Sequence, residues 1–304
     1  MNMRTGVRQG CLLSPLLFLV ALDWVTRTAF DRKRGIQWKF TTSLGDLEFA
    51  EDLALLSHRI QDMRDKTQAL EVQGVKVGLK INATKTKLMR IGTTRDDGVS
   101  VVDERIEEVD ELTYLGSIVS KKGGTDEDIQ ARIGKARRAF AMLRPILRST
   151  ALTTKTKLRV FGSNVRAVLL YGSETWRLTN SLEKKLQVFV NKSLRIWWPR
   201  KISNKELWRQ TGQRLIEQEI RQRAWGWIGH TLRRPDGHVA KRALEWNPQG
   251  KRKRGRPQHT WRRTRMAELE RKHLTWNKAK STAHNRVRWR VSVEDLCSTR
   301  NEED

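Results

Sequence analysis

Cysteine is scarce in this chain, and its scarcity excludes several kinds of site. Cys11 and Cys297 are the only two among 304 residues, which is too few for a disulfide framework or a Cys-x-x-Cys metal knuckle. The six histidines show no zinc-ligand spacing. We therefore expect no redox chemistry and no structural zinc site, and two free thiols suit a reducing compartment.

The chain also lacks a long hydrophobic run. Its apolar stretch near the start, Leu12 to Leu22, is interrupted by Ser14-Pro15 and is shorter than the roughly 20 residues that span a bilayer. No small-residue cleavage site follows it. The sequence contains no P-loop, no dinucleotide-binding glycine fingerprint and no hydrolase elbow. The short apolar run and the missing cleavage site predict a nuclear or cytoplasmic protein that is neither secreted nor inserted in a membrane.

Positive charge is what the chain has in excess. It carries 61 Lys and Arg against 34 Asp and Glu, a net charge of +27, which repels itself unless a polyanion is the usual partner. Residues 1–150 hold 25 basic and 20 acidic side chains, whereas 151–304 hold 36 and 14 and ten of the twelve tryptophans. With 38% hydrophobic residues, the chain can also bury a core. Composition therefore predicts a folded protein whose second half contacts nucleic acid.

A pair of adjacent carboxylates, Glu51 and Asp52, lies within two strand-like runs over 39–57 that surround a short turn. Neighbouring carboxylates repel each other. Mg²⁺ relieves that repulsion by binding oxygens of both side chains, or of one side chain together with a substrate phosphate. A solvated turn explains the same residues, so this segment alone leaves both interpretations open.

Two further segments flank the acidic pair. Ahead of it, a glycine loop leads into a helix over 16–30, with Ser14 as cap and Pro15 in the first turn, and this helix is apolar almost all round and expected to be buried. After it, a helical stretch from residue 60 ends at Gly78. A strand over 85–91 would then direct Lys85 and Lys87 the same way, toward a triphosphate or into solvent at a sheet edge.

The order of these segments resembles the reverse transcriptase of non-LTR (LINE-type) retrotransposons. The residues that carry the resemblance are Gly6 to Phe18, Phe49-Ala50-Glu51-Asp52, Gly78 to Asn82 with the lysines after it, and Leu112 to Gly116. The resemblance implies an α+β fold, in which a partial right-hand polymerase palm of short antiparallel strands and helices precedes a mostly helical thumb. It also implies RNA-directed DNA polymerase activity, a requirement for Mg²⁺, and a template–primer duplex of RNA and DNA as partner.

The same resemblance assigns roles to individual residues. Nucleotide and template would be positioned by Arg8, Gln9 and Gly10. Metal binding and catalysis would fall to Glu51 and Asp52, with Lys85 near the leaving pyrophosphate. The primer grip would be formed by Tyr114, Leu115 and Gly116.

Two departures from the family pattern bear on activity. Glu51 stands where the family has the first aspartate of its acidic pair, and one more methylene moves a carboxylate by about 1.5 Å, while a misplacement of about 1 Å can cost roughly 100-fold in rate. The family's upstream catalytic aspartate and fingers have no counterpart in the five residues before Gly6. We therefore expect a truncated and impaired polymerase domain. A non-catalytic nucleic-acid-binding protein and a non-functional retroelement fragment are the alternatives.

The second half of the chain is predicted to be helical. Thr125 caps a helix with an apolar stripe from Ile129 to Ile146, and further helices are expected over 154–171, 181–200, 204–233, 261–272 and 276–296. Their tryptophans suit a core better than a base-stacking platform. The resemblance divides the chain into a palm with a primer-grip-like hairpin (1–123), a thumb-like region (124–200) and a basic, tryptophan-rich C-terminal region (201–304).

Basic side chains flank the first of these helices and recur near the C-terminus. Residues 251–257 resemble an AT-hook core, whose arginines lie in an A·T-rich minor groove, although a nuclear-import signal or a phosphate-binding loop explains the same run. The residues that we expect to bind nucleic acid are Arg132, Lys135, Arg137, Arg138, Lys251, Arg252, Lys253, Arg254, Arg256, Arg262 and Arg263.

Overall fold

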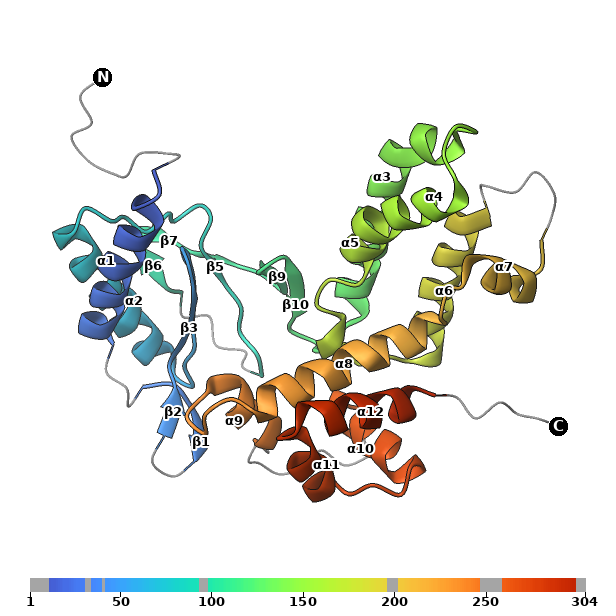
Figure 1. Ribbon diagram of the computed structural model, residues 1–304. Coiled ribbons are helices and arrows are strands. Elements are labelled where there is room, and N and C mark those ends of the chain that lie inside the picture. The colour runs from blue at the N-terminus through green and yellow to red at the C-terminus, as the bar shows by residue number, and fades with distance from the viewer. Residues whose placement is uncertain are drawn as a thin grey trace. The chain divides into compact units, whose positions relative to one another are not determined.

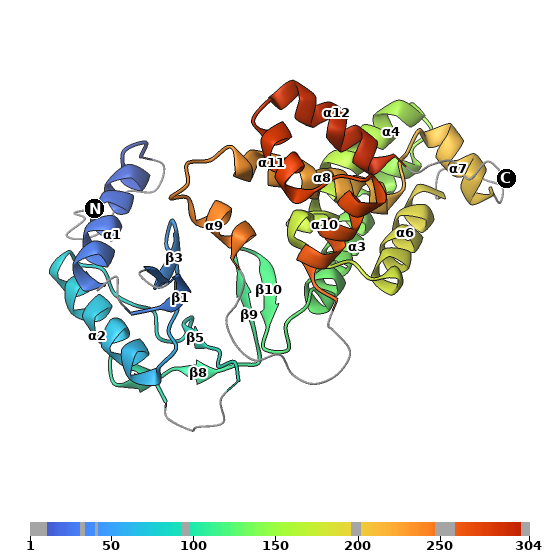
Figure 2. The ribbon, with the colours of Figure 1, turned by 90° about the horizontal axis from the view of Figure 1, so that it is seen from below.

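The structure is a computed structural model that describes residues 11–30, 34–39, 42–92, 98–195, 202–246 and 259–298. The chain divides into two compact units, Met1–Lys122 (unit 1) and Gly123–Asp304 (unit 2), whose elements are labelled in Figure 1 and seen from below in Figure 2. Unit 1 combines helices with short, mostly antiparallel strands, and unit 2 is helical where it is described. The predicted α+β class is therefore confirmed, whereas the three-part domain division stays a prediction.

The described residues of unit 1 form two helices and several two-stranded sheets. The helices are α1 (Ser14–Ala29) and α2 (Ile60–Lys76). The strand pairs are β1 (Ile36–Lys39) with β2 (Thr42–Leu44), β3 (Asp46–Phe49) with β4 (Asp52–Leu55), β5 (Lys87–Leu88) with β8 (Glu107–Glu108), β6 (Ser100–Val101) with β7 (Glu104–Arg105), and β9 (Glu111–Tyr114) with β10 (Ser117–Ser120). All pairs are antiparallel except β5–β8, which is parallel.

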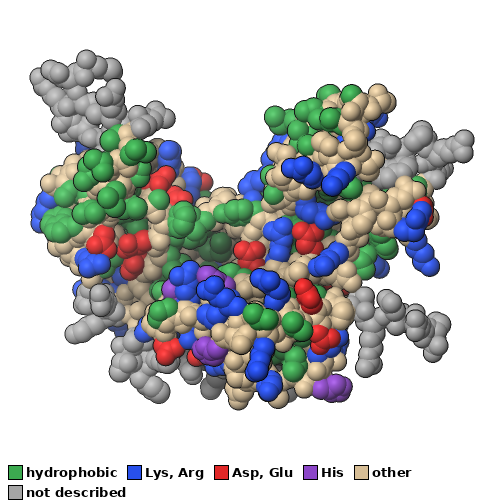
Figure 3. Space-filling view, in the orientation of Figure 1, with side chains coloured by type: hydrophobic (Ala, Val, Ile, Leu, Met, Phe, Trp, Pro, Cys, Tyr) green, Lys and Arg blue, Asp and Glu red, His purple; other side chains and the backbone are tan. Residues whose placement is uncertain are grey.

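Helix α1 corrects the expectation of a buried helix. Leu22 is only 8% exposed, but Leu17 and Val20 are 59% and 61% exposed, and Figure 3 shows hydrophobic side chains gathered over this helix. Helix α2 packs against α1, yet an all-round apolar sequence does not reveal on which side a neighbour lies. Leu13, rather than Ser14, is the N-cap residue and makes no side-chain capping bond, while Pro15 lies in the first turn as predicted.

The strand predicted over 85–91 is shorter than expected. Asn82 organises a turn in which its backbone oxygen accepts hydrogen bonds from the amides of Lys85 and Thr86, so pairing begins only at Lys87. Lys85 and Lys87 therefore do not share one strand face.

No helix in the part of the chain that the structure describes is long and apolar enough to cross a membrane.

Unit 2 is built from consecutive helical segments. They are α3 (Asp126–Arg148), α4 (Thr154–Val160), the π-helical η1 (Phe161–Arg166), α5 (Ala167–Leu169), the 3₁₀-helical η2 (Ser173–Thr175), α6 (Asn180–Leu194), α7 (Asn204–Thr211), α8 (Ile216–Leu232), α9 (Val239–Glu245), α10 (Trp261–Arg271), α11 (Trp276–Ala283) and α12 (Arg286–Cys297). The helix predicted over 154–171 is thus continuous but contains a π-helical stretch.

Two of the predicted long helices are broken, and both breaks have a local cause. Gly212, with φ of 59°, ends α7 in the left-handed region that favours glycine, so the helix predicted over 204–233 becomes α7 and α8. The helix predicted over 276–296 becomes α11 and α12, because the Asn285 side chain accepts hydrogen bonds at 3.0 Å from the amides of Val287 and Arg288 and starts a new helix.

The first helix of unit 2 follows its predicted stripe with two changes. Thr125 is the N-cap residue of α3, but its hydroxyl donates to the Arg177 carbonyl oxygen at 2.9 Å instead of accepting a capping bond. At the far end, Leu147 is buried in place of Ile146. This slip follows Pro145, which lies inside the helix and lacks the backbone N–H that a regular turn uses.

The described residues of unit 2 form two hydrophobic cores, and α8 contributes to both. The first core consists of the buried residues Ile129, Ile133, Ala136, Phe161, Val165, Leu169, Leu170, Trp176, Leu182, Leu186, Phe189, Val190, Leu194, Leu207, Ile216 and Ile220. The second core consists of Trp225, Ile228, Leu232, Leu244, Leu269, Ala279, Ala283, Trp289, Val293, Leu296 and Cys297. The buried tryptophans belong to these cores, as the sequence predicts.

Candidate functional site

The acidic pair lies at the tip of the β3–β4 hairpin. Phe49 pairs with Asp52, so Ala50 and Glu51 form the two-residue turn. Ala50 has φ of 50°, a left-handed conformation found at the first central position of the primed turns that favour hairpins. Both carboxylates are exposed. The hairpin therefore forms where the sequence predicts it and presents two adjacent acids to solvent.

The β9–β10 hairpin brings Tyr114 to the acidic hairpin. Its hydroxyl donates to the Leu47 carbonyl oxygen at 3.3 Å, and burial raises the pKa of Tyr114, with the negative charges of Asp52 and Glu48 adding to the effect. Leu115 and Gly116 form the turn of this second hairpin, and both have positive φ. The structure thus places Tyr114, one residue of the expected primer grip, against the hairpin that carries the acidic pair.

Glu48, another carboxyl group of the hairpin, lies beside α1. Burial raises the pKa of Glu48, while its hydrogen bond to Thr26 of α1 acts in the opposite direction, and the charges of Asp46 and Asp23 add to the rise.

Within the described residues, no group of three or more His, Cys, Asp or Glu is arranged to hold a metal ion. Mg²⁺ is usually held in proteins by one or two carboxylates together with waters and substrate phosphates, and the pair at the tip fits that mode.

Lys66 of α2 fixes the base of the hairpin, and sequence reasoning missed it. Its ammonium group is buried and donates at 2.9 Å to the carbonyl oxygens of Gly45 and Leu56, which precede β3 and follow β4. Burial lowers the pKa of Lys66. The available signal was its position on the buried stripe of α2, next to Thr67 and one turn before Leu70, where a lysine requires polar partners.

The two lysines expected near the pyrophosphate occupy different surroundings. Lys87 forms an ion pair with Glu107 of β8, whereas Lys85 lies exposed in the turn organised by Asn82. Among the contacts of the described residues, none joins Lys85 to the acidic pair. Its catalytic role therefore stays a prediction.

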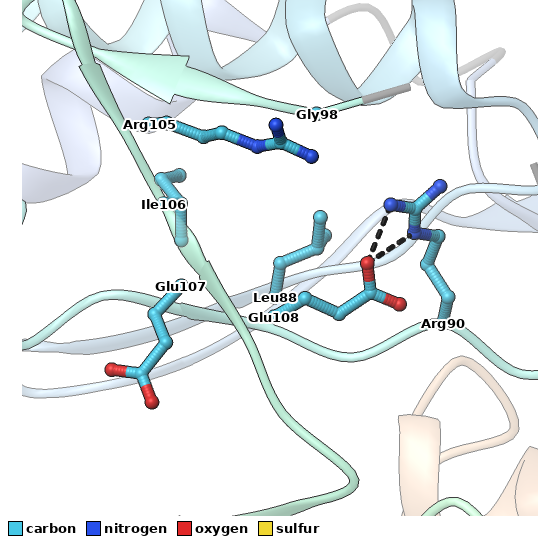
Figure 4. Close-up of a pocket in the computed structure, with 7 residues that line it drawn as sticks. All are labelled: Leu88, Arg90, Gly98, Arg105, Ile106, Glu107 and Glu108. Atoms are coloured by element: carbon cyan, nitrogen blue, oxygen red, sulfur yellow. Dashed lines mark hydrogen bonds and ion pairs between the residues drawn. The ribbon is translucent and has the colours of Figure 1, made fainter. Parts of the chain in front are cut away.

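A cavity of about 230 Å³ lies in the same unit, beside β5 and β8 (Figure 4). Arg90 donates two hydrogen bonds across it to Glu108, from Nε at 3.0 Å and from Nη2 at 2.5 Å. Arg105 and Glu107 also line it. Because positive and negative side chains are mixed in this cavity, it offers no field of one sign to a polyanion.

The basic residues predicted to bind nucleic acid differ in exposure. Arg132 is 6% exposed, with its guanidinium 4.3 Å from the centre of the Tyr171 ring and its Nε 3.8 Å from an oxygen of Asp128. Arg137 and Arg138 are exposed on α3. The buried position of Arg132 suits a role in holding the first core, whereas its neighbours present their charge to solvent.

The remaining predicted contacts are placed as follows. Lys135 is half-buried, and Arg262 and Arg263 are exposed on α10, where Arg262 donates to the Trp246 carbonyl oxygen at 3.3 Å. Arg8, Gln9, Gly10 and the AT-hook-like run with Lys251, Arg252, Lys253, Arg254 and Arg256 lie outside the described residues.

Comparison with known families identifies the class of the first part of the chain. Residues 2–119, which contain both hairpins, match the reverse transcriptase (RNA-dependent DNA polymerase) family. Residues 139–171 match a domain of unknown function. The polymerase family match thus falls within unit 1 and includes both the acidic hairpin and the Tyr114 hairpin.

One relative of the chain is described as transposon-derived. A putative uncharacterized transposon-derived protein of Caenorhabditis elegans is 28% identical over 225 residues, which cover 68% of this chain and 78% of that protein. The family match and this relative together support a reverse-transcriptase-related protein of retrotransposon origin.

Proposed function

We propose that the acidic hairpin is an RNA-directed DNA polymerase site of the LINE type with impaired activity, in a protein that binds a template–primer duplex of RNA and DNA. The observation that supports this proposal is the tip itself, where Asp52 and Glu51 lie exposed and side by side on a hairpin that Tyr114 contacts.

The residues of the hairpin would divide the work between them. Asp52 and Glu51 would hold Mg²⁺ together with the phosphates of the incoming nucleotide. When bound, such an ion lowers the pKa of the attacking hydroxyl and stabilises the leaving group. Lys66 keeps the two strands together at their base, and Tyr114 packs against the strand that precedes the turn.

Glu51 is the reason to expect impairment. Its side chain is one methylene longer than an aspartate, and it occupies the turn, where its backbone is fixed by the Phe49–Asp52 pairing. The carboxylate therefore lies about 1.5 Å further from the backbone, and a displacement of about 1 Å can cost roughly 100-fold in rate.

Primer extension on an RNA template, with Mg²⁺ or Mn²⁺, tests this proposal. We expect weak extension by the natural sequence, an increase of about 10- to 100-fold in Glu51→Asp, and none in Asp52→Asn. Asp103→Asn, an exposed aspartate in another turn of unit 1, is the matched control and should behave like the natural sequence. Activity that is equal in the natural sequence and Asp52→Asn, with no gain in Glu51→Asp, would contradict the enzyme proposal.

The second candidate is a nucleic-acid-binding protein without polymerase activity. It is supported by the net charge of +27 and by the exposed Arg137 and Arg138 on α3. Binding through six to ten phosphates would weaken by roughly 1,000- to 100,000-fold between about 50 and 200 mM salt, and Asp52→Asn would bind as the natural sequence does. Affinity that hardly changes with salt would contradict it, and the loss of both activities would leave a retroelement fragment without function.

A further inference from the structure

A groove of about 300 Å³ lies between α3 and α6 in unit 2. Cationic side chains line it from both helices: Arg137 from α3, and Lys185 and Lys192 from α6. None of the residues that line it is acidic. The groove therefore differs from the cavity of unit 1, where arginines face glutamates.

The three cations of the groove have no partner among the described residues. All three are exposed, and no hydrogen bond or ion pair engages them within the described part of the chain. Several other cations of unit 2 are paired, as Arg166 is with Glu219 and Lys280 with Glu245. Three unpaired positive charges around one concave surface repel one another, so an anionic ligand is stabilising there.

Three apolar side chains contribute to the floor of the groove. Ile133 and Phe189 belong to the first core and are buried, while Val188 beside them is 49% exposed. An exposed valine between two lysines offers a contact that a phosphate alone does not use. The ligand that fits this surface carries negative charge along its length. It also carries a flat apolar group that can turn away from the charged backbone and contact Val188.

The two lysines of α6 are arranged along one line. They are seven residues apart, which corresponds to two helical turns and about 10.5 Å of rise on the same side of the helix. Arg137 lies across the groove on α3. This spacing matches an extended polyanionic strand that runs along α6, and the planar guanidinium of Arg137 can stack on a base.

We propose that this groove binds a single-stranded stretch of RNA or DNA, with its phosphates on Arg137, Lys185 and Lys192 and one unstacked base against Val188. In a duplex the bases are stacked and paired and cannot enter a concave apolar floor, whereas bases of a single strand are free to do so. The inference rests on the nucleic-acid binding proposed above and adds a second kind of ligand and two lysines that no sequence motif marks.

Fluorescence anisotropy with the full chain tests the groove on two probes, an unstructured RNA strand and an RNA–DNA hybrid of the same length. Lys185→Gln combined with Lys192→Gln removes two phosphate contacts. For a single strand each contact contributes about 0.7 to the slope of log affinity against log salt. We expect that slope to fall by about 1.4 and the affinity for the strand to fall roughly 25-fold near 0.1 M salt, with little change for the hybrid.

A matched pair of lysines controls for net charge. Lys155 of α4 and Lys184 of α6 are exposed and do not line the groove, so Lys155→Gln combined with Lys184→Gln loses the same charge elsewhere. The base contact is tested by Val188→Gln. The natural sequence should prefer the RNA strand over an abasic strand by about tenfold, and Val188→Gln should bind the two alike.

The outcomes separate the groove from the broader proposal. If the natural sequence binds neither strand nor hybrid, nucleic-acid binding itself is wrong. The natural sequence can also bind both probes while the groove variant loses affinity for strand and hybrid equally, or loses no more affinity than the control pair does. In either case the single-strand groove is wrong, while nucleic-acid binding stands. If an acidic amphipathic peptide binds and is lost in the groove variant while RNA binding persists, the groove belongs to a protein partner instead.

Discussion

The two units treat their apolar side chains differently. In unit 2, Trp176, Leu186 and Trp225 are at most 1% exposed and belong to two extensive cores. In unit 1, the buried cluster that the structure describes comprises only Leu88, Val99, Val101 and Ile106, and α1 leaves leucine and valine at the surface. Unit 2 therefore obtains its stability from its own residues, whereas the outer side of α1 would gain free energy from further burial.

The largest expected effect concerns the buried charges of unit 2. Glu268 accepts a hydrogen bond from Trp225 Nε1 at 2.8 Å and lies 2.8 Å from Arg265 Nη1 and 3.3 Å from Arg221 Nε. Glu268→Ala leaves two buried arginines without this partner, and we expect a loss of about 4 kcal/mol in the free energy of unfolding. Urea unfolding measures it. Glu270→Ala, an exposed acid on the same helix, should change stability by less than about 0.5 kcal/mol, and equal midpoints for the two variants would contradict the prediction.

The next effect depends on close packing in the second core. A Cβ atom on Gly229 of α8 would lie 1.9 Å from Trp289 Nε1, whereas one on Gly226 of the same helix meets nothing within 4 Å. Gly229→Ala should therefore destabilise unit 2 by about 3 kcal/mol through overpacking. Gly226→Ala should stabilise it by about 0.5–1 kcal/mol, since alanine favours the helix. The two thermal midpoints should move in opposite directions. A shift of the same sign in both would show that the Trp289 side chain moves to make room for the added Cβ atom.

A third pair of variants carries the comparison into unit 1. Leu22 is 8% exposed and Leu17 is 59% exposed on the same helix. Leu22→Ala should cost about 2 kcal/mol, at the low end for a buried leucine because Leu22 lies outside the buried cluster of unit 1, and Leu17→Ala should cost less than about 0.5 kcal/mol. Circular dichroism during urea unfolding measures both. A cost for Leu17→Ala as large as for Leu22→Ala would show that the outer side of α1 is covered in solution.

The smallest effect is a pH dependence at the contact of α6 with α8. Burial raises the pKa of Glu183 to about 7, and the charge of Glu217 and a hydrogen bond to it contribute in the same direction. The folded state thus favours the protonated acid. The contribution of protonated Glu183 to stability is fully present below the pKa of the unfolded state, near 4.5. It is lost as the pH rises through about 7.

Glu183→Gln removes this titration because glutamine stays neutral. The variant should match the natural sequence near pH 4.5 and exceed it at pH 8 by about 1 kcal/mol, a value discounted for the half-buried position of the carboxyl group. Denaturant unfolding at both pH values measures the difference. A difference that is the same at both would assign the effect to packing instead of charge.

The sequence predicts features that depend on short-range patterns. Apolar runs on both sides of Glu51-Asp52 give the β3–β4 hairpin, and the spacing of Ile129, Ile133 and Ala136 gives the buried side of α3. Breaks at Gly212 and Asn285 were missed, although both residues favour helix ends, because the apolar period continues across them.

Features that depend on distant neighbours could not be predicted in this way. Arg132 lies in a basic run, and only the ring of Tyr171, 39 positions along the chain, shows that it packs inward. Lys66 similarly finds its acceptors at Gly45 and Leu56. The groove requires α3 and α6 to lie side by side, which no local pattern encodes.

The tryptophan pairs of the second core have an optical consequence. Trp225 and Trp289 meet edge to face with ring centres 6.1 Å apart, and so do Trp227 and Trp261, while only two of the twelve tryptophans precede residue 151. Ultraviolet-excited emission from this protein will therefore come mostly from unit 2. The acidic hairpin itself contains no tryptophan and can rearrange with little change in that signal, so the polymerase-like part of the chain is best followed with a dye placed on it.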